Sequence, residues 1–558
     1  MNCKEFYNTY FKIPAPYPYQ QEVWQAFLDG KFPMFIKAPS GAGKTESVVA
    51  PFLYQFIDSK ISLAPRLIYV LPTRVLINTI AKRLESYSKE INSSISVNIQ
   101  HGDTRNDPFF IGDIVVTTLD QFFYGFCRAS RQVGHHIDMP AGAIASSIVV
   151  FDEANMYRDE LTFSIMRALM EILDHSKIPF IVMTATMPSS LKNSLFENIK
   201  LTEVLSKDTE FKQNNTIKFT LLEEPLIKND EVEIPDRILE KIKNKKTLIV
   251  LNQVRKAQLV YKTLTKQLNL SEDEIVLLHS RFTLEDRTEH ENKALALIPS
   301  RNKDKFQSES LNKKRAIVVS TQVLEAGIDF SAELLLTELA PADSLVQRAG
   351  RCARYQGEQG EMIVFGLYEK KGKKEGENNE DKWHYPYTKE AIKDTERWLK
   401  ENSSFDIKSF SDACKFVDCL NYSVSDYEAK DILFDLYECV LYADTKPENI
   451  QLRSGKPVTI VVVGPFSKTQ KREKEETKIL NWIKSNDIRK KSFCVDVDFL
   501  LRLKEFIKIK YELRWDDQKN EYVVKEFSQD VKPFAKYLLD SSNYDKTIGL
   551  KDDRGLFI

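Results

Sequence analysis

The sequence of 558 residues lacks the features that place a protein in a membrane or outside the cell. No run reaches the roughly 18 consecutive apolar residues that a membrane-spanning helix needs. The N-terminus lacks the charged and then apolar pattern of a secretory signal. The seven cysteines show no regular spacing and no Cys-x-x-Cys pair, which argues against a disulfide framework and a zinc ribbon. We therefore expect a cytoplasmic protein with no membrane partner.

An excess of charge of either sign is also absent. Lys and Arg together number 80, whereas Asp and Glu number 81. Any surface that binds nucleic-acid phosphates must therefore be local. The seven histidines are scattered, with no His-Asp dipeptide and no persuasive metal-ligand spacing. The adjacent His135 and His136 are better explained as a polar loop pair than as ligands.

What is present is organised around Ala38-Pro-Ser-Gly-Ala-Gly-Lys-Thr45. An apolar run at 34–38 leads into this stretch, and residues 46–58 are expected to form a helix. A strand, a Gly-rich loop and Lys-Thr at the start of a helix form the arrangement that holds nucleotide phosphates. Lys44 would reach the terminal phosphates, and Thr45 would ligate Mg²⁺. The strict pattern has glycine where this chain has Ala38, so the loop is a variant form.

Continuous apolar runs alternate with amphipathic stretches along most of the chain. A first segment, which ends near Asn215, contains the runs 67–71, 97–100, 113–117, 147–151 and 180–184, and a second contains 247–251, 275–278, 316–320 and 361–365. Such runs predict parallel sheets covered by helices on both faces. We expect an α/β fold with domains at 1–215 and 216–370, a helical linker at 371–450 and a small C-terminal domain at 451–558. The C-terminal domain is expected to contain a strand at 458–463 and a hairpin near 511–524.

The run 147–151 is followed directly by Asp152-Glu153, which puts two carboxylates after a predicted strand. In open α/β sheets the carboxyl ends of strands are where ligands bind. Asp152 would hold Mg²⁺ while Glu153 orients and deprotonates the attacking water. These residues alone leave open that the pair only complements a helix dipole. The phosphate-binding loop expected in the same sheet favours the catalytic role.

A second constellation, Gln347-Arg-Ala-Gly-Arg-Cys-Ala-Arg354, places three arginines and a glutamine within eight residues. The fixed fork of arginine donors suits the charge on a transferring phosphoryl group. If the two units face each other, these arginines would reach a nucleotide held by the first. A basic surface helix would explain the same run, and taken alone it is the commoner explanation.

Together these stretches resemble the motifs of superfamily 2 helicases, which occur in one fixed order. In this chain the order is Gln20, residues 38–45, Leu71-Pro-Thr-Arg74, Thr117-Thr-Leu-Asp-Gln121, Asp152-Glu153, Thr184-Ala-Thr186, Ser320-Thr-Gln-Val-Leu-Glu-Ala-Gly-Ile-Asp329 and residues 347–354. The resemblance covers about residues 20–354. It implies two tandem RecA-like domains that bind ATP and Mg²⁺.

The resemblance also implies roles for individual residues. Gln20 would read adenine, Gln347 would position the water, and Arg351 and Arg354 would be arginine fingers. The remaining nucleotide contacts would come from Ser40, Gly41, Ala42, Gly43, Lys44, Thr45, Glu46, Gly327 and Asp329. Contacts to nucleic-acid phosphates, without base reading, would come from Thr73, Arg74, Thr117, Gln121, Ser280, Arg281 and Thr321.

Three details narrow the resemblance. They are Leu278-His-Ser-Arg-Phe282 with Asp286-Arg287, then Thr321-Gln-Val-Leu-Glu325, and Thr118-Leu-Asp-Gln121. They are similar to the helicase of type I CRISPR interference systems, an ATP-dependent translocase that unwinds DNA from 3′ to 5′ along a single strand. That family acts on a DNA loop opened by an RNA-guided surveillance complex. Only 19 residues precede Gln20, so the resemblance implies the split form, in which the HD nuclease is a separate subunit.

Two positions depart from the family pattern. Asn155 stands where the family usually has histidine, which puts in question how hydrolysis is coupled to movement. Ala353 replaces a usual glycine, a change that a helical backbone at this position would tolerate. Two other functions stay open. One is a different superfamily 2 enzyme, such as an RNA helicase or a duplex translocase, and the other is an ATP-gated nucleic-acid clamp without turnover.

Overall fold

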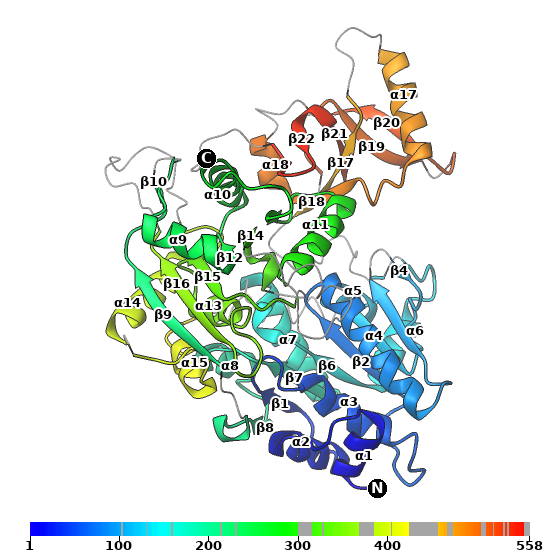
Figure 1. The fold of residues 1–558 in the computed structure, drawn as a ribbon. Coiled ribbons are helices and arrows are strands. Elements are labelled where there is room, and N and C mark those ends of the chain that lie inside the picture. Colours follow the sequence, from blue (N-terminus) through cyan, green and yellow to red (C-terminus); the bar gives the residue numbers. More distant parts are fainter. Residues whose placement is uncertain are drawn as a thin grey trace. The chain divides into compact units, whose positions relative to one another are not determined.

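Figure 1 shows the fold of the chain in a computed structural model. The structure describes residues 1–101, 104–130, 132–157, 160–211, 215–228, 231–298, 315–325, 329–367, 384–402, 404–422, 456–465, 472–503, 509–516, 518–527, 530–532 and 535–551. Contacts divide the chain into two compact units. One comprises residues 1–213 and 402–454, and the other comprises residues 214–401 and 455–558.

A sheet that is parallel except at one edge forms the centre of the first unit. In the described part its strands lie in the order β4-β3-β5-β2-β6-β7-β1-β8, and only the short β4 runs antiparallel to its neighbour. The bounds are β1 Met34–Lys37, β2 Arg66–Leu71, β3 Val97–His101, β4 Thr104–Arg105, β5 Ile114–Thr118, β6 Ser147–Phe151, β7 Phe180–Thr184 and β8 Thr202–Leu205. The predicted strands of this segment are confirmed. The edge strands β4 and β8 were not predicted.

Alternate residues of the strands point to opposite faces of this sheet. Leu67, Tyr69 and Leu71 of β2 pack on the side of α1–α4, whereas Ile68 and Val70 pack on the side of α5–α8. The helices on the first side are α1 Cys3–Tyr10, α2 Pro18–Leu28, α3 Lys44–Tyr54 and α4 Arg74–Ile91. Those on the second side are α5 Leu119–Phe126, α6 Asp138–Ala145, α7 Glu160–His175 and α8 Ser189–Leu195. Both faces are therefore covered, as the continuous apolar strands require.

Two further segments complete the first unit. The 3₁₀ turn η1, Ala154–Met156, follows β6 directly, and η2 spans Asp208–Glu210. Helix α15, Phe410–Val417, begins at a hydrogen bond from Phe410 N to Asp208 Oδ1 of 2.6 Å. After the helix, Asp418 Oδ1 accepts from Ser189 N at 2.8 Å.

The second unit contains a fully parallel sheet in the order β13-β14-β12-β15-β16-β9. Its strands are β9 Thr216–Leu222, β12 Lys246–Val250, β13 Ile275–Leu278, β14 Ala316–Ser320, β15 Leu334–Glu338 and β16 Gln359–Phe365. Its other elements are α9 Asp236–Asn244, α10 Val254–Gln267, α11 Leu284–Leu297, η3 Gln322–Leu324, α13 Ala342–Ala349, α14 Lys389–Glu401 and the short pair β10 Ile227–Lys228 and β11 Glu231–Val232. The four predicted strands are confirmed, and β9 and β15 were not predicted.

The C-terminal part of this unit contains a mixed sheet in the order β18-β17-β21-β19-β20. Its elements are β17 Pro457–Val463, α17 Arg472–Ser485, β18 Ser492–Asp496, α18 Val497–Leu503, β19 Tyr511–Asp516, β20 Glu521–Glu526, β21 Lys536–Asp540, η5 Ser541–Asn543, β22 Tyr544–Asp545 and β23 Gly549–Leu550. Helices α17 and α18 contribute to separate apolar clusters formed by opposite faces of this sheet. The predicted strand at 458–463 and hairpin near 511–524 are confirmed.

The chain end of the second unit packs on the loop that follows β13. His279 Nε2 lies 3.0 Å from Ile548 O, and Leu550 N donates to Arg281 O at 3.2 Å. Gly549 has φ +76°, and a Cβ there would lie 2.6 Å from the His279 ring and 2.8 Å from Arg281 O. Only glycine fits this close approach without a shift of the neighbouring chain. Among the described helices, none is long and apolar enough to cross a membrane.

Candidate nucleotide-binding site

The loop predicted to bind phosphate connects β1 to α3, which begins at Lys44. Gly41 and Gly43 have φ values of +83° and +79°, a conformation that other residues rarely adopt. A Cβ on Gly43 would lie 2.6 Å from Gln20 Nε2. That same nitrogen donates to Gly43 O at 2.9 Å, and Tyr19 donates its hydroxyl to Ala42 O at 2.6 Å. Helix α2 is thus bonded to the loop, and a contact of Gln20 with adenine stays a prediction.

Lys44 is folded over the loop. Its Nζ donates to Ala38 O at 3.2 Å and to Pro39 O at 3.4 Å, and the residue is 7% exposed. Two carbonyl groups only partly compensate a buried ammonium, and an anion would compensate it better. The site is therefore suited to a phosphate group beside Lys44.

Thr45 and Asp152 meet through the hydroxyl of Tyr69. The Tyr69 oxygen lies 3.2 Å from Thr45 Oγ1 and 2.6 Å from Asp152 Oδ2. Asp152 Oδ1 accepts from Glu153 N at 2.8 Å. Burial and the neighbouring Glu153 raise the pKa of the Asp152 carboxyl to about 6, although Lys44 and the hydrogen bonds act in the opposite direction. A divalent cation would favour the ionised form of this carboxyl.

The donor set at this point fits Mg²⁺. Thr45 offers a hydroxyl and Asp152 a carboxylate, which are the hard oxygen ligands that Mg²⁺ uses together with water and substrate phosphates. The described residues contain no cluster of three His, Cys, Asp or Glu side chains that could hold a metal without such help. Thr45 and Asp152 would therefore hold the cation jointly with a bound nucleotide, and this role stays a prediction.

Glu153 has a left-handed backbone, with φ +52° and ψ +44°. Such a conformation costs a non-glycine residue about 1–2 kcal/mol. Strained residues of this kind concentrate at functional sites. The turn directs the chain from β6 into η1, and the Glu153 side chain is half-buried. The catalytic role of Glu153 stays a prediction that this geometry favours.

Asn155 connects the acidic motif to the Thr184-Ala-Thr186 segment. Its Oδ1 accepts from Thr184 Oγ1 at 3.0 Å, and Thr186 N donates to the same threonine oxygen at 3.1 Å. Asn155 is 2% exposed. The amide thus connects two of the predicted motifs within the first unit, and the effect of Asn155 on coupling stays a prediction.

Glu46 has protein partners on α4. Its Oε1 accepts from Arg83 Nη1 at 3.2 Å and from the Tyr87 hydroxyl at 2.9 Å. These bonds connect α3, which carries Lys44 and Thr45, to the helix that begins at Arg74. A direct contact of Glu46 with nucleotide stays a prediction.

The nucleic-acid residues predicted in the first unit differ in accessibility. Thr73 precedes α4, and its Oγ1 has no hydrogen-bond partner among the described residues, while Arg74 is exposed. Gln121 is half-buried. Thr117 is wholly buried, and its hydroxyl donates to Gln100 O at 2.8 Å. Arg74 is therefore the best placed of the four to meet a phosphate backbone, whereas the Thr73 hydroxyl is buried.

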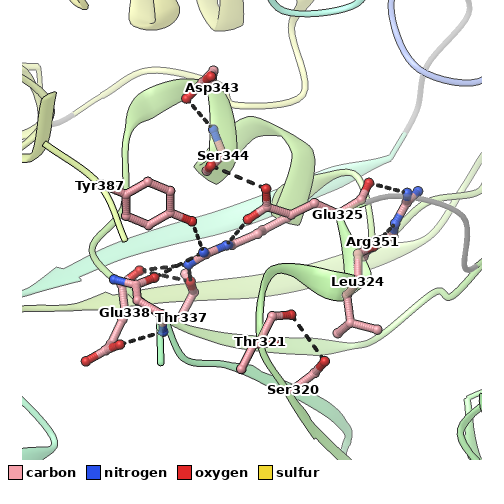
Figure 2. A network of polar contacts seen from close by, with 12 residues as sticks. Ser320, Thr321, Leu324, Glu325, Thr337, Glu338, Asp343, Ser344, Arg351 and Tyr387 are labelled. Atoms are coloured by element: carbon pink, nitrogen blue, oxygen red, sulfur yellow. Dashed lines mark hydrogen bonds and ion pairs between the residues drawn. The ribbon is translucent and has the colours of Figure 1, made fainter. Parts of the chain in front are cut away.

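A buried polar network lies in the second unit, between η3, α13 and the sheet. Figure 2 shows Glu325, Thr337 and Tyr387 pointing toward one centre. That centre is the Arg348 guanidinium, which is 1% exposed. It donates to Glu325 Oε1 at 2.9 Å, Thr337 Oγ1 at 2.8 Å, Glu338 O at 3.2 Å, Asn252 Oδ1 at 3.1 Å and the Tyr387 hydroxyl at 2.9 Å.

The two predicted arginine fingers are bonded to the same region. Arg351 donates from Nε to Leu324 O at 3.1 Å and from Nη2 to Glu325 O at 2.8 Å (Figure 2). Arg354 Nε lies 2.9 Å from Asp329 Oδ1, and its Nη1 is buried without a partner in the described residues. The structure thus pairs two predicted site residues, Arg354 and Asp329.

Other predictions in the second unit have mixed outcomes. Gln347 is half-buried on α13. The predicted nucleotide contact Gly327 lies outside the described residues. Ala353 is not helical, because it follows α13 with φ +42°, so the condition under which the alanine would be tolerated is not met. The left-handed turn allows Ala353 N to donate to Ala332 O at 3.0 Å, which a continued helix would prevent.

The remaining nucleic-acid candidates lie after β13 and β14. Ser280 is exposed, whereas Thr321 is 2% exposed. The Arg281 guanidinium lies 3.9 Å from the centre of the Phe499 ring. Burial and the nearby Arg281 charge lower the pKa of His279 to about 3, so His279 is neutral. The C-terminal part of the unit therefore contacts the segment predicted to bind nucleic acid.

Two family models match this chain. The DEAD/DEAH box helicase model covers residues 17–194, which include the phosphate-binding loop and Asp152-Glu153. The model for the C-terminal part of the CRISPR-associated nuclease/helicase Cas3 covers residues 243–357. These matches indicate a DEAD/DEAH box helicase domain followed by a Cas3-like C-terminal domain, and the loop predicted to bind phosphate lies within the first of them.

Individual relatives narrow the class. The chain is 28% identical over 417 residues to the putative CRISPR-associated nuclease/helicase Cas3 of Methanocaldococcus jannaschii, covering 69% of this chain and 51% of that protein. It is 30% identical over 349 residues to the CRISPR-associated helicase Cas3 of Thermoproteus tenax, covering 60% of this chain and 55% of that protein. The crystal structure of T. fusca Cas3 with AMPPNP matches with a TM-score of 0.68 at 18% identity, covering 99% of this chain and 70% of that one.

These similarities relate the chain to the Cas3-like helicases. The predicted α/β fold with two RecA-like parallel sheets is confirmed by the structural match and by the two sheets described above. The chain spans about half the length of the curated relatives that it matches.

Two residues of the site were not predicted. Tyr69 lies within an apolar strand, and Arg348 was noted only as part of an arginine-rich run. A tyrosine in a strand between two motif-bearing strands is a weak signal for the first. For Arg348, a comparably weak signal is Glu325, an acidic residue within the motif at residues 320–329 of the same unit.

Proposed function

We propose that this protein hydrolyses ATP to move from 3′ to 5′ along single-stranded DNA and to unwind duplex during type I CRISPR interference. The observation that carries the proposal is that Lys44, Thr45 and Asp152 converge on one site in a Cas3-like chain. In this proposal Lys44 exchanges its two carbonyl partners for the terminal phosphates. Bound Mg²⁺ would neutralise phosphate charge there, held by Thr45 and Asp152.

The remaining residues of the first unit would couple this site to DNA. Glu153, held in its strained turn, would orient and deprotonate the attacking water. Asn155 would transmit a change at the acidic motif to Thr184 through their hydrogen bond. Thr73 and Arg74 would contact DNA phosphates rather than bases, because a translocating motor has to pass over every sequence.

The proposed partners follow from the family. A Cas3-like helicase of type I systems would be recruited to DNA by an RNA-guided surveillance complex. The separate HD nuclease that we propose would cut the strand that the helicase exposes. The T. tenax relative is named a CRISPR-associated helicase and the M. jannaschii relative a nuclease/helicase, and the first name agrees with the proposed division of the two activities.

The direction and the substrate are tested by strand displacement. Duplexes with a 3′ or a 5′ single-stranded DNA tail would be incubated with the protein, ATP and Mg²⁺, alongside equivalent RNA tails. We expect strand displacement from the duplex with a 3′ tail, because a motor that moves from 3′ to 5′ along that tail runs into the duplex. We expect no displacement by Lys44→Ala. Displacement that starts only from the 5′ tail, or only from RNA, would overturn the proposed direction or substrate.

The partners are tested by reconstitution. A target DNA opened by a type I surveillance complex would be combined with this protein, an HD nuclease, or both. We expect ATP-dependent cutting beyond the opened region only with both proteins. Such cutting by this protein without the nuclease would contradict the separate-subunit proposal.

A further inference from the structure

We propose that Tyr69 is a positioning residue that holds Thr45 and Asp152 in the orientation needed to bind a divalent cation. The inference rests on the proposed Mg²⁺ site. Tyr69 lies in β2, between β5 and β6, and it is wholly buried. Its hydroxyl is 3.2 Å from Thr45 Oγ1 in the first turn of α3 and 2.6 Å from Asp152 Oδ2 after β6. One hydroxyl thus bridges two residues that come from different elements.

The chemistry of the three groups sets the direction of the hydrogen bonds. A phenol keeps its proton at neutral pH, and an ionised carboxylate only accepts. The Tyr69 hydroxyl therefore donates to Asp152, and its oxygen is left to accept the hydrogen of Thr45. This hydrogen then points toward Tyr69, which leaves the lone pairs of the Thr45 oxygen directed elsewhere. A hydroxyl that ligates a cation has to present such a lone pair.

Asp152 is held at both of its oxygens. Oδ2 accepts from Tyr69 at 2.6 Å, and Oδ1 accepts from Glu153 N at 2.8 Å. These two bonds fix the rotation of the carboxylate, and each oxygen retains further capacity to accept. Without the Tyr69 hydroxyl, Thr45 could turn its own hydrogen toward Asp152. That bond would occupy the oxygen atoms proposed to hold the cation.

The test compares Tyr69→Phe with the parent protein. Phenylalanine keeps the buried ring and removes only the hydroxyl. The affinity for a fluorescent ADP analogue would be measured at a series of Mg²⁺ concentrations and in EDTA, with melting temperatures to verify folding. We expect the Mg²⁺ concentration for half-maximal enhancement of binding to rise roughly tenfold or more, the range seen when groups that orient metal ligands are removed. Affinity in EDTA should change little.

Tyr54→Phe is a matched control, because Tyr54 is a buried tyrosine at the other end of α3 whose hydroxyl bonds Asp58 at 3.2 Å. It should leave the Mg²⁺ requirement unchanged. An unchanged requirement in Tyr69→Phe, or an equal loss of affinity with and without Mg²⁺, would overturn the positioning role. If nucleotide binding by the parent protein shows no Mg²⁺ dependence, the proposed Mg²⁺ site itself is wrong. When Tyr69→Phe is combined with Thr45→Ala, the rise in the required Mg²⁺ concentration should be smaller than the product of the two separate rises, because both residues act on one site.

Discussion

Arg348 and Glu325 form an ion pair of 2.9 Å whose side chains are only 1% and 6% exposed. Glu325 follows η3, and Arg348 lies on α13, so the pair connects the two segments that carry Arg351, Arg354 and Asp329. Arg351 is bonded to the same η3 segment through two carbonyl groups. A buried pair of this kind is fragile to the loss of one partner, because the other charge is left uncompensated.

Arg348→Ala is therefore expected to lower the free energy of unfolding by about 3–5 kcal/mol. Chemical denaturation of the full chain measures the effect. Arg397→Ala is the control, since that side chain is 66% exposed and pairs with Asp394 on the surface of α14. Its loss should cost less than about 1 kcal/mol. Equal effects of the two substitutions would contradict a structural role for the buried pair.

Asn155→Ala should uncouple nucleic acid from ATP turnover. The substitution leaves Thr184 Oγ1 without its acceptor at 3.0 Å, while Lys44, Thr45 and Asp152 keep their contacts. We expect the stimulation of ATP hydrolysis by single-stranded DNA to fall at least about fivefold, the lower range of coupling between sites, with a smaller effect on unstimulated turnover. Asn155→His, which restores the usual family residue, should retain stimulation. A proportionate loss of both rates in Asn155→Ala would show that Asn155 serves the chemistry instead.

Gly549→Ala should loosen the contact between the chain end and the loop after β13. The new Cβ would meet the His279 ring at 2.6 Å and Arg281 O at 2.8 Å, in a backbone with φ +76°. We expect a loss of at least about 1–2 kcal/mol in the free energy of unfolding, from backbone strain alone. Gly464→Ala offers a comparison, because no heavy atom lies within 4 Å of its added Cβ. If Gly464→Ala is as costly as Gly549→Ala, the packing described for this segment is incorrect.

His279 should make stability depend on pH. Burial and the Arg281 charge lower its pKa from 6.5 to about 3. Because the pKa is depressed in the folded chain, the contribution of His279 to the free energy of unfolding is fully present above pH 6.5 and is lost as the pH falls toward 3. Between pH 7 and pH 5 this group alone should cost about 2 kcal/mol in the free energy of unfolding. Protonation would also remove the Nδ1 acceptor for Arg281 N at 3.1 Å.

The control for this pH effect is His279→Gln, whose side chain does not titrate. The difference in unfolding free energy between parent and variant, measured at several pH values, isolates the histidine. That difference should shrink by about 2 kcal/mol between pH 7 and pH 5. A difference that stays constant would contradict a neutral, buried His279.

The strands that the sequence predicts well are those buried on both faces. The runs at 147–151 and 180–184 are continuous apolar stretches, and the structure places them in the interior of the first sheet. The edge strand β8 was missed because only one of its four residues is buried. The edge strand β9 was missed for a similar reason, since its side chains are exposed or half-buried. The exposed side chains of β8 and β9 give a weak apolar signal. Burial does not explain every outcome, because the interior strand β15 is wholly buried and was also missed.

For the candidate site, the distance in sequence between interacting residues decided which of them the sequence predicted. Lys44, Thr45, Asp152 and Glu153 were found because adjacent residues form each motif. Tyr69 and Arg348 were not found, because their partners are distant in sequence: Tyr69 and Asp152 are 83 positions apart, and Arg348 and Glu325 are 23 apart. Only the three-dimensional fold brings such residues together. The left-handed backbone of Ala353 was not predicted, because its hydrogen bond to Ala332 O is a contact that local propensity does not reveal.

The most direct test of the proposed motor is release of phosphate from ATP by the purified protein and by Lys44→Ala. Each would be measured with Mg²⁺ and no nucleic acid, single-stranded DNA, single-stranded RNA or blunt duplex. We expect strong stimulation by single-stranded DNA, abolished in the variant because the phosphate-binding ammonium is missing. Stimulation by RNA or blunt duplex alone would point to another branch of superfamily 2. ATP-dependent binding of nucleic acid with no phosphate release under any condition would contradict the motor and favour a clamp.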